Sequence, residues 1–237
     1  MELEILHQTD RLVVVNKPAG LLVHRTSLER TATTFLLQVL RNQIGQRVYP
    51  IHRLDKPTSG IILFALDPDH AREMSLLFGT DQFTKRYLAV LRGYCPEEGV
   101  INHPLVPDHG GEAREAITRF RRLETVELPY AVGIFNTARY SLVEAEPVTG
   151  RRHQIRRHFR HIRYPIIGDT RFGDRHHNRF INTTLDIPGM LLHAWRAEWI
   201  NPEDGHKTVV TAGIPVKWER MADICNWQPV IRKLYLK

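Results

Sequence analysis

The segment from His52 to Gly60, HRLDKPTSG, places a carboxylate among turn-forming residues directly before an apolar run. A turn that leads into a buried strand can hold a side chain rigidly at a cleft, so Asp55 is a candidate catalytic carboxylate. An Asp before Lys-Pro-Thr can also cap a turn through its side chain, and on pattern alone this structural interpretation is the stronger one. No second acidic residue has a spacing that would predict a two-metal site.

The densest cationic stretch is TGRRHQIRRHFRHIR at residues 149–163. Helical spacing would place Ile155, Phe159 and Ile162 on one apolar stripe. The neighbouring face would then carry Arg152, Arg156, Arg160 and Arg163. Like charges four residues apart repel, so a sequence that keeps them usually has anions nearby, and nucleic-acid phosphates are the obvious ones. The alternative is a solvated basic face that has no partner.

Two further features of these regions have ordinary explanations. The three histidines at 153, 158 and 161 have spacings that metal ligands can have, but the flanking arginines would repel a dication, and we predict no metal site. Tyr87 enters a strand in the segment FTKRY. A core tyrosine is the common case, and a ring that stacks on an extruded RNA base is the functional alternative.

The composition is that of a soluble globular protein that favours polyanionic partners. Hydrophobic residues make up 42% of the 237-residue chain, and the formal net charge is +7. RNA, DNA and anionic membranes are the candidate partners. Cys95 and Cys225 form neither a disulfide framework nor a cysteine zinc site. Because the sequence has no signal-peptide pattern and no run near ~20 apolar residues, we expect a cytoplasmic protein without a membrane span.

The elements that would position these residues alternate irregularly, which favours an α+β fold. Asp67 followed by Pro68 predicts a capped helix that continues to Gly79. The other expected helices are residues 31–44 and 151–163. The expected strands are residues 12–15, 61–66, 85–93, 134–146, 191–200 and 208–212. Residues 103–115 and 173–188 are expected to be flexible, and the pattern of residues 216–237 predicts no particular structure.

Six motifs in order resemble the large family of RNA pseudouridine synthases that act on rRNA and tRNA. They are NKPAGL at 16–21, HRLDKPTSG at 52–60, KRY at 85–87, TGRRHQIR at 149–156, PIIGD at 165–169 and LLHA at 191–194. The resemblance covers nearly the whole chain. It implies a central, mostly antiparallel sheet flanked by helices with an RNA-binding cleft. It also implies that residues 1–237 form a single catalytic domain of two packed subdomains, without a separate N-terminal RNA-binding domain.

The resemblance also implies roles for individual residues. Asp55 aligns with the catalytic aspartate, Arg156 with the arginine that pairs with it, and Tyr87 with the base-stacking tyrosine. Arg53 aligns with the arginine that helps to fill the gap left by the flipped nucleotide, and Ile155 with an apolar pocket residue. The expected RNA-binding residues are His52, Arg53, Arg151, Arg152, Ile155, Arg157 and Arg160. Isomerisation of uridine involves neither a redox change nor a group donor, so no cofactor is expected.

A narrower similarity concerns the RNA substrate. GRRHQIRRH at 150–158, LVHR at 22–25 and LPYA at 128–131 resemble the branch of the family that modifies uridine 65 of tRNA. This similarity predicts tRNA as the partner, and we infer no obligate protein partner. An rRNA-directed synthase of the same chemistry and a non-catalytic RNA-binding protein are the alternatives. The joint presence of Asp55, Tyr87 and Arg156 argues against the second, because RNA binding needs only the basic surface.

Overall fold

The computed structural model describes residues 1–24 and 34–236. Arg25 and the start of the helix expected at 31–44 lie outside the described residues. The chain forms two compact units, one of residues 1–85 and 194–213 and the other of residues 86–193 and 214–237. Strands β5 (Phe83–Arg92) and β9 (Leu192–Ile200) each contribute residues to both units.

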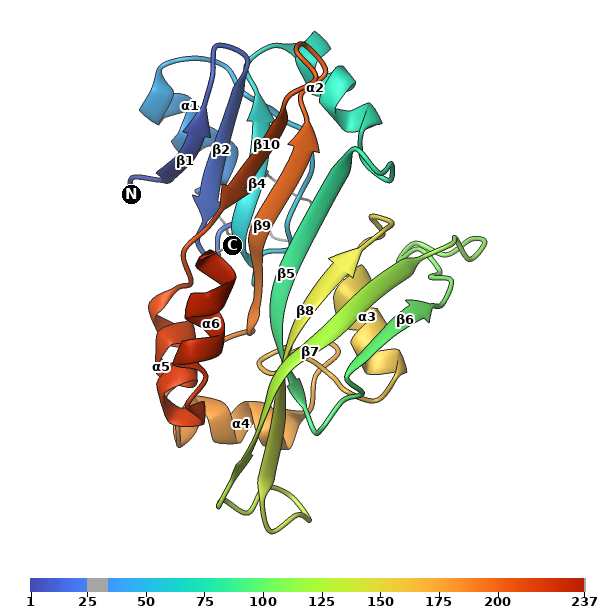
Figure 1. Ribbon diagram of the computed structural model, residues 1–237, viewed down its shortest axis with the longest axis vertical. Helices are drawn as coiled ribbons and strands as arrows, with labels where there is room; N and C mark the ends of the chain where they lie inside the picture. Colours follow the sequence, from blue (N-terminus) through green and yellow to red (C-terminus); the bar gives the residue numbers. More distant parts are fainter. Residues whose placement is uncertain (25–33, 237) are drawn as a thin grey trace. The chain divides into compact units, whose positions relative to one another are not determined.

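The first unit is a sheet with two helices. Its strands lie in the order β1-β2-β4-β9, and β3 pairs with β4 and β10 with β9 (Figure 1). The pairs β1–β2, β2–β4, β3–β4 and β9–β10 are antiparallel. The remaining elements are β1 (Glu4–Gln8), β2 (Leu12–Lys17), α1 (Leu36–Ile44), β3 (Tyr49–Pro50), β4 (Ser59–Ala65), α2 (Pro68–Leu76) and β10 (Lys207–Thr211).

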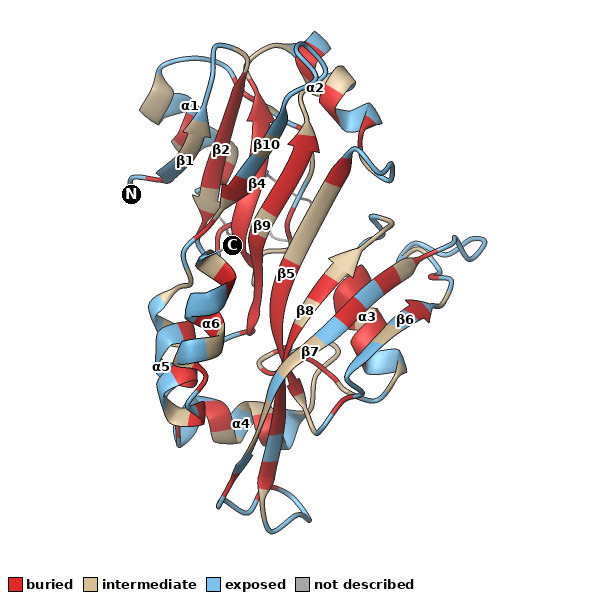
Figure 2. Cartoon of the chain, in the orientation of Figure 1, coloured by how far each residue is buried: buried red, intermediate tan, exposed pale blue. Residues whose placement is uncertain are grey.

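Local sequence explains most of this unit. The apolar runs of β2 and β4 are buried along nearly their whole length, as expected for central strands (Figure 2). Helix α2 begins as predicted, because the Asp67 carboxylate accepts a hydrogen bond of 2.7 Å from the backbone N–H of His70 and Pro68 opens the first turn. Met74 is buried, and the helix ends at Leu76, before the predicted Gly79.

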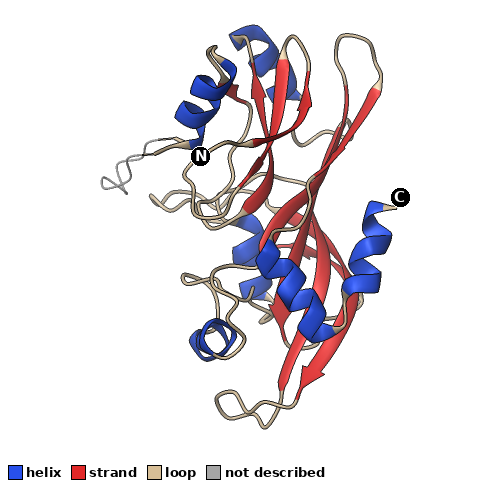
Figure 3. Ribbon diagram, turned by 90° about the vertical axis from the view of Figure 1, so that its left-hand side faces the viewer, coloured by secondary structure: helices blue, strands red, loops and turns tan. Residues whose placement is uncertain are grey.

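The second unit contains the antiparallel strand order β5-β8-β7-β6 and four helices. Its further elements are β6 (Glu98–Asn102), β7 (Ile117–Leu128), β8 (Ala138–Pro147), α3 (Gln154–His161), α4 (Arg175–Thr183), α5 (Val216–Cys225) and α6 (Gln228–Tyr235). Helices lie on both sides of these strands (Figure 3). Phe159 of α3 meets Phe120 of β7 edge-on, with ring centroids 5.6 Å apart. Between α5 and α6, the buried Trp227 donates its indole N–H to the carbonyl oxygen of Thr125 on β7.

The α+β class and the mostly antiparallel strands flanked by helices are as predicted. Three differences stand out. Helix α4 occupies residues that we expected to be flexible, because His177 and Ile181 are buried within this polar segment. Strand β7 was not predicted, and α5 and α6 give the C-terminal segment a packed structure with the buried Trp218. Helix α3 is shorter than the predicted 151–163, since it begins at Gln154 and ends at His161.

Residues 103–115, which we expected to be flexible, form no helix or strand and contain one isolated bridge between Leu105 and Arg114. The strand expected at 134–146 begins only at Ala138, because the preceding residues form a tight turn. None of the described helices is both long enough and apolar enough to cross a membrane.

Candidate active site

Asp55 lies in the loop that joins β3 to β4, in the first unit, and is half-buried. The backbone carbonyl of Asp55 accepts a hydrogen bond of 3.0 Å from the N–H of Thr58. A backbone bond therefore closes this turn. Thr58 and Ser59 are buried, and the next residues enter the central strand β4. The candidate carboxylate is thus carried by a short loop that is anchored at its C-terminal end in the core.

A buried lysine holds the same loop from the other side. The ammonium group of Lys17 donates hydrogen bonds to the carbonyl oxygens of Pro18 (2.9 Å), Leu21 (2.8 Å) and Lys56 (3.2 Å). Because a buried charge is tolerated only where such bonds replace water, these contacts fix the backbone around the cation. Lys17 thereby ties the loop after β2 to the loop of Asp55. The sequence placed Lys17 in a family motif, but the motif alone gave it no role.

Gly60 requires glycine for two separate reasons. Its φ of +109° is a conformation that side chains of L residues rarely adopt, and a Cβ atom at this position would lie 2.1 Å from the carbonyl oxygen of Ala194. The close approach of these two backbones lets β4 begin directly after the loop. The glycine that ends the TSG motif therefore supports the position of Asp55.

His52 is held by β4. Its Nε2 accepts a hydrogen bond of 3.2 Å from the backbone N–H of Leu63, which requires this nitrogen to be unprotonated. Burial, and to a smaller extent the charge of Lys85, lower the pKa of His52 to about 3. The ring is therefore neutral near pH 7 and holds the loop, whereas the neighbouring Arg53 is exposed and charged.

Lys85 is a half-buried cation of the same unit. Burial lowers its pKa to about 8, and its ammonium group lies 4.3 Å from the centroid of the Phe78 ring. Such a position over an aromatic face partly compensates for lost hydration. The sequence identified Lys85 only as part of the KRY motif.

Tyr87 lies in the second unit, two residues further along β5. It pairs with Ala145 of β8 and is only 7% exposed. The preceding Arg86 forms an ion pair with Glu146, with 3.5 Å between the charged groups. Strand β5 is buried on both faces beyond this point, so the backbone that carries the Tyr87 ring is rigid.

The start of α3 is fixed by the side-chain amide of Gln154. Its oxygen accepts hydrogen bonds from the Thr149 hydroxyl (2.7 Å) and the Arg151 N–H (2.9 Å). Its nitrogen donates to the carbonyl oxygen of Ile117 (2.9 Å) and to the hydroxyl of Thr118 (3.1 Å). Because the amide must present its oxygen and its nitrogen in the correct orientation, it determines how α3 sits on β7. These bonds give a structural reason for the glutamine of the TGRRHQIR motif.

Arg156 is buried and paired within its own unit. Its Nε and Nη2 atoms donate to the two carboxylate oxygens of Asp169, at 2.7 Å and 2.8 Å, and only 5% of the residue is exposed. Burial raises the pKa of Asp169, but the bonds from Arg156 and from the backbone N–H groups of Phe172 and Arg171 outweigh it and hold the pKa below its usual value. Arg156 is therefore not part of a solvated cationic face.

Other arginines of the predicted basic stretch also have partners inside the protein. Arg152 forms an ion pair with Asp108 (3.1 Å), and Arg171 pairs with the same carboxylate (3.2 Å). Arg157 donates to the carbonyl oxygen of Val106, and Arg151 to that of Glu115. The inference that these charges must have nearby anions was correct, but for Arg152 and Arg156 the anions are carboxylates of this chain.

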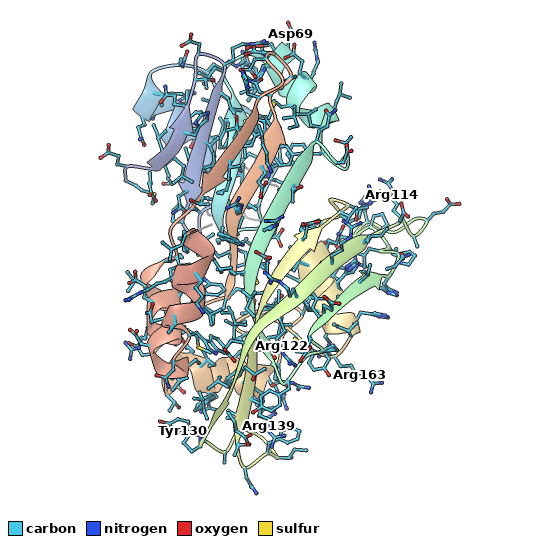
Figure 4. The ribbon with its side chains drawn as sticks, viewed as in Figure 1. Asp69, Arg114, Arg122, Tyr130, Arg139 and Arg163 are labelled. Atoms are coloured by element: carbon cyan, nitrogen blue, oxygen red, sulfur yellow. The ribbon has the colours of Figure 1, made fainter. Side chains whose placement is uncertain are left out.

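Arg160 and Arg163 differ from the exposed Arg151 and Arg152, which have protein partners. Arg160 and Arg163 are exposed as well, and neither has an ion pair among the residues that the structure describes (Figure 4 labels Arg163). Arg163 lies beyond the end of α3 and has a φ of +69°, so it does not continue the helical stripe as expected. Ile155 and Phe159 are buried, which confirms the apolar stripe for these two positions.

The histidines of this segment serve packing. His158 is fully buried between the hydroxyl of Thr118 (2.9 Å) and the carbonyl oxygen of His103 (3.1 Å). The carbonyl requires a proton on Nε2, so Nδ1 accepts from the hydroxyl. Burial lowers the pKa of His158 to about 4. His161 stacks on His103 with ring centroids 3.7 Å apart. Within the described parts of the chain, no three His, Cys, Asp or Glu side chains are grouped so that they could hold a metal ion.

The two units carry different chemical groups. The first carries a half-buried carboxylate on a rigid loop, which suits a nucleophile or a base. The second carries a buried arginine and an aromatic ring on rigid backbone, together with exposed arginines that suit phosphate contacts.

Comparisons with known proteins assign this chemistry to a family. The model of the RNA pseudouridylate synthase family matches residues 11–161. The chain is 45% identical to tRNA pseudouridine synthase C of Pasteurella multocida (strain Pm70), over 96% of this chain and 98% of that one. It is 43% identical to the protein of the same name from Haemophilus ducreyi (strain 35000HP / ATCC 700724), over 96% and 97% of the two chains.

A solved structure agrees with these matches. Human RNA Pseudouridylate Synthase Domain Containing 4 superposes with a TM-score of 0.74 at 25% identity, and the match covers 94% of this chain and 93% of the human one. The motifs, the fold and the similarity along nearly the whole chain all agree, and the chain belongs to the RNA pseudouridylate synthase family.

Proposed function

We propose that this protein is a tRNA pseudouridine synthase whose target is uridine 65. Its family isomerises uridine to pseudouridine in RNA, so the enzyme is an isomerase. The observation that carries the choice of tRNA is the match to proteins named tRNA pseudouridine synthase C along nearly the full length of both chains. The position within tRNA rests on the similarity of residues 128–131 and 150–158 to the branch that modifies uridine 65.

The proposed reaction needs a carboxylate and no group donor. The N1–C1′ bond of the uridine breaks, the uracil turns, and C5 bonds to C1′. C5 loses its proton to solvent, and N1, which no longer bonds to C1′, gains one, so atoms and charge balance. Asp55 acts in this proposal either as a nucleophile or as the base that removes a sugar proton to give a glycal. Both routes require the carboxylate in its ionised form.

The other residues take the roles that the family resemblance implies. Arg156 is the arginine of the catalytic carboxylate, Tyr87 stacks on the extruded base, and Ile155 borders the base. Stacking recovers about 1–3 kcal/mol of the free energy that unstacking the base consumes. The proposed backbone and nucleotide contacts come from Arg53, Arg151, Arg152, Arg157 and Arg160. For His52, its bond to β4 supports a loop-positioning role instead.

The domain organisation, protein partners and cellular location of the enzyme belong to the same proposal. Residues 1–237 act as one catalytic domain that includes both compact units, and no obligate protein partner is required. A cytoplasmic location is part of the proposal, because tRNA is modified there. No metal or cofactor enters the proposed steps.

Tritium release tests this function most directly. Transcripts of tRNA and rRNA with C5-tritiated uridine are incubated with the enzyme, and the modified position is then mapped. We expect release from tRNA with a single new pseudouridine at position 65. Release from rRNA alone would identify rRNA, not tRNA, as the substrate. Modification at another tRNA position would exclude position 65 as the target. Binding of both RNAs without release would indicate a non-catalytic RNA-binding protein.

A further inference from the structure

The tip of the β7–β8 hairpin exposes apolar side chains on a rigid turn. Val132 and Phe135 exchange two backbone hydrogen bonds, of 3.0 Å and 3.2 Å, around the central residues Gly133 and Ile134. Gly133 has a φ of +63°, as the first central residue of a two-residue hairpin turn of this kind requires. The turn presents Ile134 at 92% exposure and Phe135 at 56%. A β-branched apolar residue at such a tip is unfavourable in water unless a partner covers it.

Helix α4 lies against this tip and adds positive charge. The ring of Tyr130 contacts the ring of Phe180 with centroids 5.2 Å apart, and a Cβ atom at Gly133 would lie 3.9 Å from the Cβ of His176. Tyr130 is labelled in Figure 4 at this end of the hairpin. The stripe of α4 next to these contacts carries Arg175 and Arg179, both exposed.

The two arginines have no protein anion to balance them. No ion pair involves Arg175 or Arg179 within residues 1–24 and 34–236, α4 contains no acidic residue, and the tip loop at 129–137 carries no charge. The carboxylates closest in sequence are already used. Asp174 caps α4 and pairs with Arg92, and Glu127 pairs with Arg139.

We propose that Tyr130, Ile134, Phe135, Arg175, His176 and Arg179 form a second RNA-binding surface, here named the hairpin-tip surface. The proposal rests on the proposed function, since it concerns the RNA substrate of the same enzyme. Exposed aromatic rings beside unpaired arginines are the combination that binds unstacked bases and phosphates together. The occupant is a part of the substrate RNA remote from the target uridine.

Charge favours RNA over a second copy of this chain. Two hairpin-tip surfaces brought together would place the arginines of both copies side by side, and no carboxylate of the surface would neutralise them. A polyanion covers the apolar tip and neutralises the arginines at the same time, and each neutralised phosphate also releases counterions.

The length of β8 determines which part of the RNA reaches this surface. Tyr87 pairs with Ala145, seven residues along β8 from Ala138 at the tip end. At ~3.3 Å per residue, the two places are about 23 Å apart along the strand. The RNA must therefore extend at least about 23 Å beyond the target nucleotide. A stem-loop that extends less far than this from the target cannot bind both places.

The test compares two RNA substrates, two hairpin-tip double variants and two control variants. The hairpin-tip variants are Ile134→Ser with Phe135→Ser, and Arg175→Gln with Arg179→Gln. The matched controls are Val100→Ser, an apolar residue of β6 that is 63% exposed, and Arg220→Gln, an exposed arginine that pairs with Asp186. Tritium release gives KM and kcat on full-length tRNA and on a short stem-loop with the same target uridine. Filter binding gives the affinity for each RNA without dependence on catalysis.

We expect each hairpin-tip variant to raise KM and Kd for tRNA about tenfold, which corresponds to about 1.4 kcal/mol. We expect kcat on tRNA to stay within twofold of wild type. On the stem-loop, KM, kcat and Kd should all stay within twofold of wild type. The control variants should behave like wild type on both RNAs. Unchanged constants on tRNA, equal losses on both RNAs, or equal losses in the controls would overturn the hairpin-tip surface. A changed oligomeric state with unchanged RNA affinity would identify the surface as an interface between copies.

The two proposals fail in different ways. If the wild-type enzyme releases no tritium from any transcript, the proposed function fails, and filter binding still decides whether the hairpin tip contacts tRNA. If release is normal and the hairpin-tip variants bind tRNA like wild type, only the second surface fails. Melting temperatures within ~2 °C of wild type establish that the variants fold, as expected for exposed positions.

Discussion

Arg156 and Asp169 form a buried two-point ion pair between α3 and the segment that precedes α4. The guanidinium group cannot rotate without breaking both bonds, and the carboxylate is itself held by the backbone N–H groups of Arg171 and Phe172. Asp169 is therefore the residue that orients Arg156. The sequence located both residues in family motifs, but nothing in their spacing of 13 positions identified them as partners.

Asp169→Asn removes the carboxylate that accepts two hydrogen bonds from the buried Arg156 guanidinium group. We expect a loss of about 3–5 kcal/mol in the free energy of unfolding, measured by urea denaturation. Adding Arg156→Met removes the buried charge and should recover a large part of this stability, while pseudouridine formation remains below detection. If the double variant regained activity together with stability, Arg156 would have only a structural role.

Asp55→Asn keeps the shape of the loop, because the turn is closed by the backbone of residue 55. We expect tritium release to fall below detection while the Kd for tRNA stays within about threefold of wild type, since the substitution removes the reacting carboxylate and leaves the binding residues in place. The melting temperature provides the control for folding. Substantial turnover by this variant would remove Asp55 from the catalytic step.

Tyr87→Leu removes the aromatic face and keeps an apolar side chain on β5. We expect kcat to fall by about 5- to 150-fold and tRNA affinity by less than threefold, because a stacked base contributes about 1–3 kcal/mol and only after extrusion. Tyr87→Phe retains the ring and should keep most of the stacking. Equal losses of kcat and affinity in Tyr87→Leu, matched by an equal loss of stability, would mean that the ring is a packing residue.

Arg160→Gln tests the exposed end of α3. Arg160 has no ion pair within the described residues, so its charge is available to a phosphate. We expect the slope of log K for tRNA against log salt to become shallower by about 0.7–0.9. Arg121→Gln is the matched control, because Arg121 is exposed on β7 and already pairs with Glu144. If Arg160→Gln leaves this slope unchanged, the Arg160 side chain does not contact the RNA.

Buried histidines predict how stability depends on pH. The folded pKa values of His158 and His52 are about 4 and about 3, below the ordinary value of 6.5, so the unfolded chain binds more protons between pH 6.5 and 4. The free energy of unfolding should therefore fall as pH falls below about 6.5, by about 2 kcal/mol at pH 5 from His158 alone. Urea denaturation at pH 7.5 and pH 5 measures this. His158→Gln should flatten the dependence, and an equally steep dependence in that variant would exclude His158 as its source.

The sequence predicts best where structure is decided by neighbours in the chain. Asp67 and Pro68 begin α2 through contacts within four residues, and the apolar run of β4 needs no knowledge of its partners to be identified as a buried strand. Asp55 could be selected because its turn, its motif and the following strand are contiguous. For such features the local chain contains most of the determining interactions.

Prediction failed where the determining partner is distant in sequence. Strand β7 alternates buried residues with arginines and glutamates, and its charged face is balanced by ion pairs such as Arg121 with Glu144. The sequence of helix α4 is as polar as that of a loop, and the contact that buries its His177 is with the hydroxyl of Tyr140, 3.0 Å away and distant in sequence. The helical spacing of α3 put Arg156 on a cationic face, and only the fold shows that this position is buried against Asp169.

The three carbonyl bonds of Lys17 have a consequence for how this protein can change through evolution. Lys17 donates to the backbone oxygens of positions 18, 21 and 56, so these bonds constrain the path of the two loops. A substitution that shifts either backbone path would displace the other loop as well, because both contact the same ammonium group. An insertion or deletion in either loop should therefore be harder to accommodate than a side-chain exchange that leaves the backbone path unchanged. The backbone of the loop that carries Asp55 is thus constrained by a lysine nearly forty residues earlier in the chain.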